Sequence, residues 1–100
     1  PVSAARETPT PLVLHGNAPN PFNPLTRIAF ASAAAGPGRL VVTDLAGRRV
    51  LVRGLDVAEG ENTVSWAGRD GDGRLVAGGV YLYTITAPGG AASGRMLLLK

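Results

Sequence analysis

The sequence predicts an all-β fold: an immunoglobulin-like, antiparallel β-sandwich of about seven strands. Short runs rich in Val, Leu, Ile, Thr and Tyr recur about every ten residues, separated by clusters of Gly, Pro, Asn and Asp. Within these runs apolar and polar residues alternate, and no segment shows the period of about 3.6 residues that marks an amphipathic helix. Because the chain has no cysteine, the expected core has no disulfide and rests on its large rings, Phe22, Phe30, Trp66, Tyr81 and Tyr83.

The chain is expected to divide into an arm and one domain. Residues 1–11 combine Pro, Thr, Ala and charged residues without periodicity, which predicts a flexible Pro-rich arm or linker. Residues 12–100 are long enough for one domain with its own hydrophobic core. The domain would open with a short strand at its first three residues, with Leu12 and Leu14 on one face.

Residues 17–24 predict a rigid corner. Prolines fix φ and remove amide donors, and each restricts the residue before it to extended conformations. Asparagine side chains can bond to nearby backbone groups and close turns. Phe22 lies among these residues and is expected to plug one end of the core. The corner residues concerned are Asn17, Pro19, Asn20, Pro21, Asn23 and Pro24.

The middle of the chain predicts three strands. The first spans residues 26–31, and a small-residue turn over 32–38 follows it. A hairpin then joins strands at 39–45 and 48–55 through a tight Ala-Gly turn, before a polar connection at 56–61. The side chains expected to point inward from these strands include Ile28, Phe30, Leu40 and Val42.

The last third predicts strands at residues 62–66, 80–87 and 92–100, the last two joined by a Pro-Gly-Gly turn. The Gly- and Asp-rich loop at 68–73 follows the first of them. We expect the strands on either side of that loop to pair through a long, hairpin-like connection at the centre of the core. Their inward side chains would be Val64, Trp66, Tyr81, Tyr83 and Ile85.

Composition excludes several classes of protein. Without cysteine there is no thiolate metal site, and no apolar run approaches the length of a membrane-spanning helix. The net charge is +3, but the basic residues are spread along the chain and the densest pair, Arg48-Arg49, lies at a predicted turn. Nucleic-acid-binding proteins usually cluster basic residues on one face with aromatic residues between them. The sequence therefore predicts no nucleic-acid partner.

The first candidate functional site is a calcium-binding loop. Asp70-Gly-Asp-Gly73 resembles half of one, but the completing glutamate of an EF-hand is absent. Asp-Gly pairs are common in turns, so a turn is favoured and weak calcium binding at Asp70 and Asp72 is the alternative. The acidic residues of the 56–61 connection favour a solvated loop.

Catalysis and sugar binding are the other candidates. The single histidine, His15, would need a serine (Ser3, Ser32, Ser65 or Ser93) and an acid beside it, and nothing marks such a set. Trp66, Tyr81 and Tyr83, if exposed, could stack on a sugar, but their alternation with small polar residues favours the core. The glycines do not open a helix and form no phosphate-binding loop. The sequence predicts no catalytic residue, no metal site and no cofactor.

Several segments together resemble a known family. Asn-Pro-Phe-Asn-Pro at 20–24 is similar to the opening of C-terminal domains of the type IX secretion sorting-domain-like family, which resembles the Ig-like domain of the flagellar hook-capping protein. Residues 42–50 are similar to that family's hairpin, and residues 66–83 to its Trp…Gly-Val-Tyr-x-Tyr signature. Thr43, Ala67 and Gly78 stand where the family usually has Tyr, Asp and Ser. The matching positions, expected to be structural, are Asn20, Pro21, Phe22, Asn23, Pro24, Asp44, Gly47, Arg48, Trp66, Gly68, Asp70, Gly73, Gly79, Val80, Tyr81, Tyr83 and Lys100.

The resemblance implies a non-catalytic module of an exported bacterial protein. Such domains lie at the C-terminus of secreted or surface proteins, and the motif here ends with Lys100. The expected role is sorting or cell-surface attachment, with export or anchoring machinery as partner and an extracytoplasmic location. The alternative is a structural or accessory subunit of a large assembly, docking through its sheet edges or its N-terminal arm. A hook-cap scaffold would share the fold but needs an upstream hook-binding region.

Overall fold

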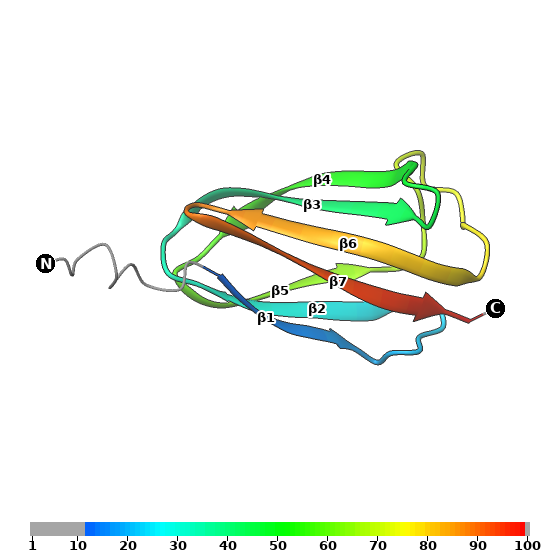
Figure 1. Ribbon diagram of the computed structural model, residues 1–100, viewed down its shortest axis with the longest axis horizontal. Coiled ribbons are helices and arrows are strands. Elements are labelled where there is room, and N and C mark those ends of the chain that lie inside the picture. Colours follow the sequence, from blue (N-terminus) through cyan, green and yellow to red (C-terminus); the bar gives the residue numbers. More distant parts are fainter. Residues whose placement is uncertain (1–11, 100) are drawn as a thin grey trace, which may run out of the picture.

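The computed structural model describes residues 12–99, which form seven strands in two antiparallel sheets (Figure 1). The smaller sheet has the order β1-β2-β5 and the larger one the order β4-β3-β6-β7. This architecture confirms the predicted all-β sandwich. The strands are β1 (Leu12–Ala18), β2 (Thr26–Ser32), β3 (Gly36–Asp44), β4 (Arg49–Val57), β5 (Gly60–Trp66), β6 (Gly79–Ala87) and β7 (Gly90–Leu98).

The core lies between the sheets and uses alternate residues of their strands, because successive side chains of a strand point to opposite faces. Along β6, Tyr81, Tyr83 and Ile85 are buried. Leu82, which lies between the two tyrosines, and Thr86, which follows Ile85, are exposed. The same alternation buries the residues predicted to point inward from β2 and β3, which are Ile28, Phe30, Leu40 and Val42. Val64 is only partly buried and packs against this core.

The strands that flank the Asp-Gly loop do not pair with each other, contrary to the sequence-based expectation. β5 pairs with β2 in the smaller sheet, whereas β6 pairs with β3 and β7 in the larger one. The loop therefore crosses from one sheet to the other. Hydrophobic alternation shows that one face of a strand points to the core, but it does not show to which of the two sheets the strand belongs. The sequence therefore predicted the wrong partner strand for β5 and for β6.

The turn predicted over residues 32–38 is also too long, since Gly36, Pro37 and Gly38 already belong to β3. In this part of β3 the strand pairs with β4, with Pro37 opposite Asp56, and β6 begins to pair at Arg39. A proline is tolerated there because no third strand requires its missing amide.

Other strand boundaries differ from the predicted ones by a few residues. β1 continues beyond the predicted three residues to Ala18, with an irregularity in its pairing at His15. The connection between β4 and β5 shortens to Ala58 and Glu59. The arm predicted at residues 1–11, and Lys100, lie outside the described residues. Within residues 12–99, no helix is long and apolar enough to cross a membrane.

Candidate functional site

Most of the motif residues gather at one end of the sandwich, which we call the motif end. It comprises the segment between β1 and β2, the β3–β4 turn, the β5–β6 loop and the last residues of β7 (Figure 1). These segments are far apart in the sequence, so the fold alone brings them together. Their side chains form a buried aromatic cluster, two carboxylate-centred turns, a closed strand edge and an open groove.

The aromatic cluster is centred on Trp66, which is 1% exposed. Its ring centroid lies 5.7 Å from that of Phe22 and 5.4 Å from that of Tyr81, in tilted and edge-on geometries that favour aromatic pairs. The indole Nε1–H donates to the carbonyl oxygen of Arg69 at 2.8 Å, and the Tyr81 hydroxyl donates to the carbonyl of Ala77. This confirms Phe22 as the plug at one end of the core.

Burial of these rings excludes the sugar-stacking alternative. Tyr81 is 6% and Tyr83 2% exposed, so neither presents a ring face to solvent. Burial also raises the pKa of both phenols above the usual value, and for Tyr81 the charge of Asp44 adds to the increase. The hydroxyls therefore stay protonated, and that of Tyr81 acts as a hydrogen-bond donor.

Asp44 holds the turn between β3 and β4. Its Oδ1 accepts from the amides of Ala46 (2.9 Å) and Arg48 (3.0 Å), and its Oδ2 accepts from Arg48 Nε at 3.0 Å. The backbone hydrogen bond from Arg48 is the main reason that the pKa of Asp44 lies below its ordinary value. Gly47 has a φ of +88°, a conformation that favours glycine in this turn. The motif's Asp-x-x-Gly-Arg pattern is thus explained by local turn chemistry.

Asp70 organises the β5–β6 loop in the same way. Its Oδ1 accepts from the amides of Asp72 (2.9 Å) and Arg74 (3.0 Å). The loop is fastened to β4 because the amide of Gly71 donates to the carbonyl of Val50 at 3.1 Å. This is the turn that the Asp-Gly pattern favoured over calcium. Among residues 12–99, no three His, Cys, Asp or Glu side chains gather closely enough to hold a metal ion.

The outer edge of β7 is closed by the segment before β2. Asn20 Nδ2 donates to the carbonyl of Arg95 at 3.4 Å, and the amide of Leu97 donates to Asn20 Oδ1 at 3.0 Å. The backbone of Phe22 continues this pairing, donating to the carbonyl of Leu97 (2.9 Å) and accepting from the amide of Leu99 (2.8 Å). The Asn20 carboxamide therefore replaces a peptide group of an additional strand. The outer edge of β7 is therefore covered over residues 95–99, where it could otherwise pair with another chain.

This role of Asn20 was missed in the sequence, which predicted that the corner asparagines close local turns. Asn17 agrees better with that expectation, since its Nδ2 lies 3.5 Å from the carbonyl of Pro19 and also donates to Thr26 Oγ1 at 3.1 Å. The partners of Asn20 lie 75 and 77 residues away along the chain. No local signal in the sequence identifies such a partner.

We expect Asn20→Ala to lower the free energy of unfolding by about 1–2 kcal/mol, because two backbone groups of β7 lose their partner. The amide of Leu97 should also exchange its hydrogen faster. Chemical denaturation and hydrogen exchange measure the two effects. Asn23→Ala, an exposed position in the same segment, is the matched control. Equal losses in the two variants would contradict the edge-closing role of Asn20.

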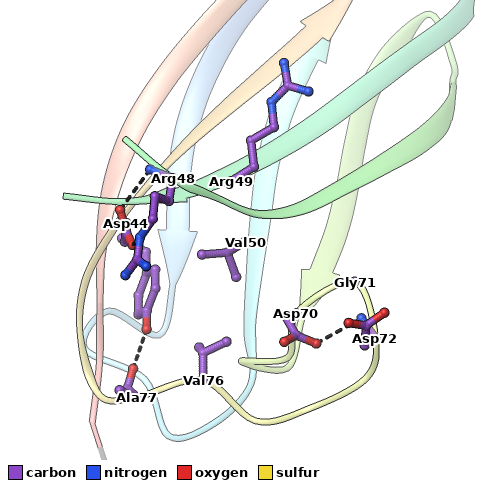
Figure 2. A pocket seen from close by; sticks show the side chains of 10 residues that line it. Asp44, Arg48, Arg49, Val50, Asp70, Gly71, Asp72, Val76 and Ala77 are labelled. Atoms are coloured by element: carbon purple, nitrogen blue, oxygen red, sulfur yellow. Dashed lines mark hydrogen bonds and ion pairs between the residues drawn. The ribbon is translucent and has the colours of Figure 1, made fainter. Parts of the chain in front are cut away.

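An open groove of about 540 Å³ is lined in part by Tyr81 of the aromatic cluster (Figure 2). Arg48 and Arg49 line it on one side and Asp70 and Asp72 on the other, with the apolar side chains of Val50 and Val76 between them. None of the ten lining residues is Ser, Thr, Cys or His, so the lining holds no Ser–His or Cys–His pair. The groove can offer polar and apolar contacts to another molecule.

His15 lies on β1, an edge strand of the smaller sheet, with its side chain 44% exposed. Its Nε2 is 3.1 Å from Glu61 Oε1. Of the serines considered with it, Ser3 lies outside the described residues. Ser32 donates to the carbonyl of Ala34 and Ser93 bonds to the hydroxyl of Thr84. The structure does not bring His15, Ser32 and Ser93 into a catalytic set.

One further residue that the sequence did not single out is Arg53 of β4. Its Nη1 donates to the carbonyl of Ser65 on β5 at 2.7 Å. The bond joins the edges of the two sheets on the side of the sandwich opposite β1 and β7. Like Asn20, Arg53 satisfies a strand-edge carbonyl that would otherwise face solvent.

No known family model and no curated protein matches the sequence, but solved structures with a similar fold exist. Dimeric latent PorU from Porphyromonas gingivalis superposes with a TM-score of 0.71 at 18% identity, over 88% of this chain and 9% of that one. FlgD from Xanthomonas campestris, whose hook capping is essential for flagellar assembly, gives 0.63 at 23% identity, over 86% of this chain and 64% of its own.

PorZ from Porphyromonas gingivalis, an essential surface component of the type IX secretion system, gives a TM-score of 0.59 at 27% identity, over 87% of this chain and 11% of that one. The chain thus spans about a tenth of PorU and PorZ and under two thirds of FlgD. These likenesses confirm the fold. They agree with the suggested family, since they include a type IX secretion component and a hook-capping protein.

Proposed function

We propose that this chain is a non-catalytic, Ig-like module of an exported bacterial protein, acting in sorting or attachment at the cell surface. The observation that carries the proposal is the shared fold with PorZ, together with the convergence of the resembling motif residues at one end of the sandwich. The partners in this role are proteins of the export or anchoring machinery, outside the cytoplasm.

The arrangement of the motif end supports a binding role over a catalytic one. Its carboxylates, Asp44 and Asp70, accept hydrogen bonds from backbone amides and so hold turns. Its hydroxyl, on Tyr81, donates to a backbone carbonyl. These three groups are engaged in holding the end rigid, which suits a surface that must present one shape to a partner.

The test is export of a cargo. A fluorescent protein joined to the N-terminus of the full chain would be expressed in a bacterium with type IX secretion machinery, and the labelled cell surface quantified. We expect at least about tenfold more cargo at the surface than for cargo without the chain, since specific binding discriminates by one to several kcal/mol. The same fusion in a strain lacking the machinery is the control. Equal surface labelling in these cases would contradict the proposal.

A structural subunit that docks through a sheet edge is the second candidate, and β4 favours it. β4 is an edge strand, and its Val50 carbonyl, which accepts from Gly71, points away from β3. Val52, Gly54 and Asp56 share that orientation because strand backbone groups alternate, so they can pair with another strand. The intact mass of the native polypeptide separates the candidates: a mass near 10.2 kDa favours the subunit, and a much larger one the module.

A further inference from the structure

The outer face of the larger sheet carries a regular pattern, of which only Arg49 also lines the groove of the motif end. The register places side chains in rows across β4, β3, β6 and β7, because directly paired residues share a face. We call these rows the sheet face. In strand order they are Arg49, Thr43, Leu82 and Arg95; then Val52, Val41, Thr84 and Ser93; then Gly54, Arg39, Thr86 and Ala91.

The sheet face is apolar and hydroxyl-rich at its centre. Leu82 of β6 is 38% and Val52 of the edge strand β4 is 46% exposed. The hydroxyls of Thr84 and Ser93, in the same row as Val52, lie 2.9 Å apart. A shallow depression of about 500 Å³ runs over this part of β6 and β7 and reaches Arg95.

The charges of the sheet face have one sign. Its twelve positions include three arginines and no carboxylate. The ion pairs found among residues 12–99 lie elsewhere, between His15 and Glu61 and between Arg48 and Asp44. Asp56 lies on the same side of β4 as Val52, but it pairs with Pro37, and β6 pairs with β3 only from Arg39 onward. Asp56 therefore lies outside the three rows.

We propose that the sheet face is a docking surface for a protein partner that presents carboxylates around a flat apolar patch. The inference rests on the proposed function, whose partner it describes. Arg49 and Arg95 stand at the two edges of one row, three inter-strand spacings apart, which is about 14 Å. Partner carboxylates at that separation would meet both guanidinium groups, while Leu82 between them packs against apolar side chains.

Two other occupants fit the pattern less well. A second copy of this chain, packed face to face, would bring the same arginines together, and like charges at an interface are repulsive. A sulfated or phosphorylated polysaccharide is bound best by closely clustered positive charge. Here Thr43 and Leu82 separate the two arginines of the row. Both occupants are outcomes of the test.

The test is site-specific photo-cross-linking in cells. A benzophenone amino acid replaces Leu82 in the full chain, joined to its cargo, in the host used for the export assay. The matched control places it at Val13, which is 43% exposed on β1 of the smaller sheet. We expect a Leu82-specific product with a protein whose cross-linked peptide contains Asp or Glu.

The second part of the test reverses the charges of the sheet face. Arg49→Glu with Arg95→Glu should lower the yield of the product at least about tenfold, because it replaces attraction by repulsion on both edges of the row. Arg27→Glu, on β2 of the smaller sheet, is the control and should leave the yield unchanged. Circular dichroism of each purified variant shows that it folds; should the double variant not fold, each single reversal is used in its place.

Several outcomes would overturn the proposal: equal products at Leu82 and Val13, a yield insensitive to charge reversal, a product with a second copy of this chain, or a product with carbohydrate. Absence of a Leu82-specific product from a folded chain overturns it as well, whether or not the cargo is exported. Surface labelling of the cargo is measured in the same cells. A failure of the proposed function is therefore seen separately from a failure of the docking surface.

Discussion

Trp66→Ala is expected to lower the free energy of unfolding by about 3–5 kcal/mol. The ring is 1% exposed and lies between Phe22 and Tyr81, so truncation removes two aromatic contacts and leaves a cavity. It also leaves the carbonyl of Arg69 without the indole donor. Because these contacts join the β1–β2 segment to the larger sheet, the variant should lose the packing of the whole motif end. Equilibrium denaturation in urea measures the change.

The control for Trp66 is Leu45→Ala at the β3–β4 turn. Leu45 is 67% exposed, and substitutions at such positions usually change stability by less than about 0.5 kcal/mol. A loss below about 1 kcal/mol for Trp66→Ala would contradict the core position of the ring. It would also restore the interpretation that this ring can stack on a sugar.

Gly38→Ala is expected to cost about 1–3 kcal/mol, or to prevent folding, although the new side chain is a single methyl group. An added Cβ would lie 2.5 Å from the carbonyl oxygen of Thr86 and 2.6 Å from Val57 Cγ2. The first of these atoms belongs to the backbone of β6 and cannot move without disturbing the sheet. Thermal and chemical unfolding of the purified variant measure the loss.

The matched control is Gly54→Ala on the neighbouring strand, paired with Arg39, the residue after Gly38. A Cβ at Gly54 would meet no atom within 4 Å. There the substitution should be neutral or should stabilise the protein by up to about 1 kcal/mol, through a smaller entropy of the unfolded chain. Equal effects of the two substitutions would show that β3 and β6 do not approach each other as closely as described.

Much of the fold and part of the candidate site could be predicted because they depend on neighbours in the chain. The alternation in β2 and β6 placed Phe30 and Tyr83 in the core, where they are found. The β3–β4 turn depends on Asp44 and Arg48, which are four residues apart, and the β5–β6 turn on bonds within four residues of Asp70. Hydrogen bonds between residues so close in the chain can be predicted from a sequence.

The sequence by itself thus determined where the seven strands lie to within a few residues, which side chains face the core and how the tight turns close. The tertiary structure decided that β5 and β6 lie in different sheets, that Asn20 covers the edge of β7, and that Arg49 and Arg95 share a row. The physical reason is that alternation has the same period in every strand. It specifies inside and outside, but the partner and register of a strand depend on packing against residues distant in the chain.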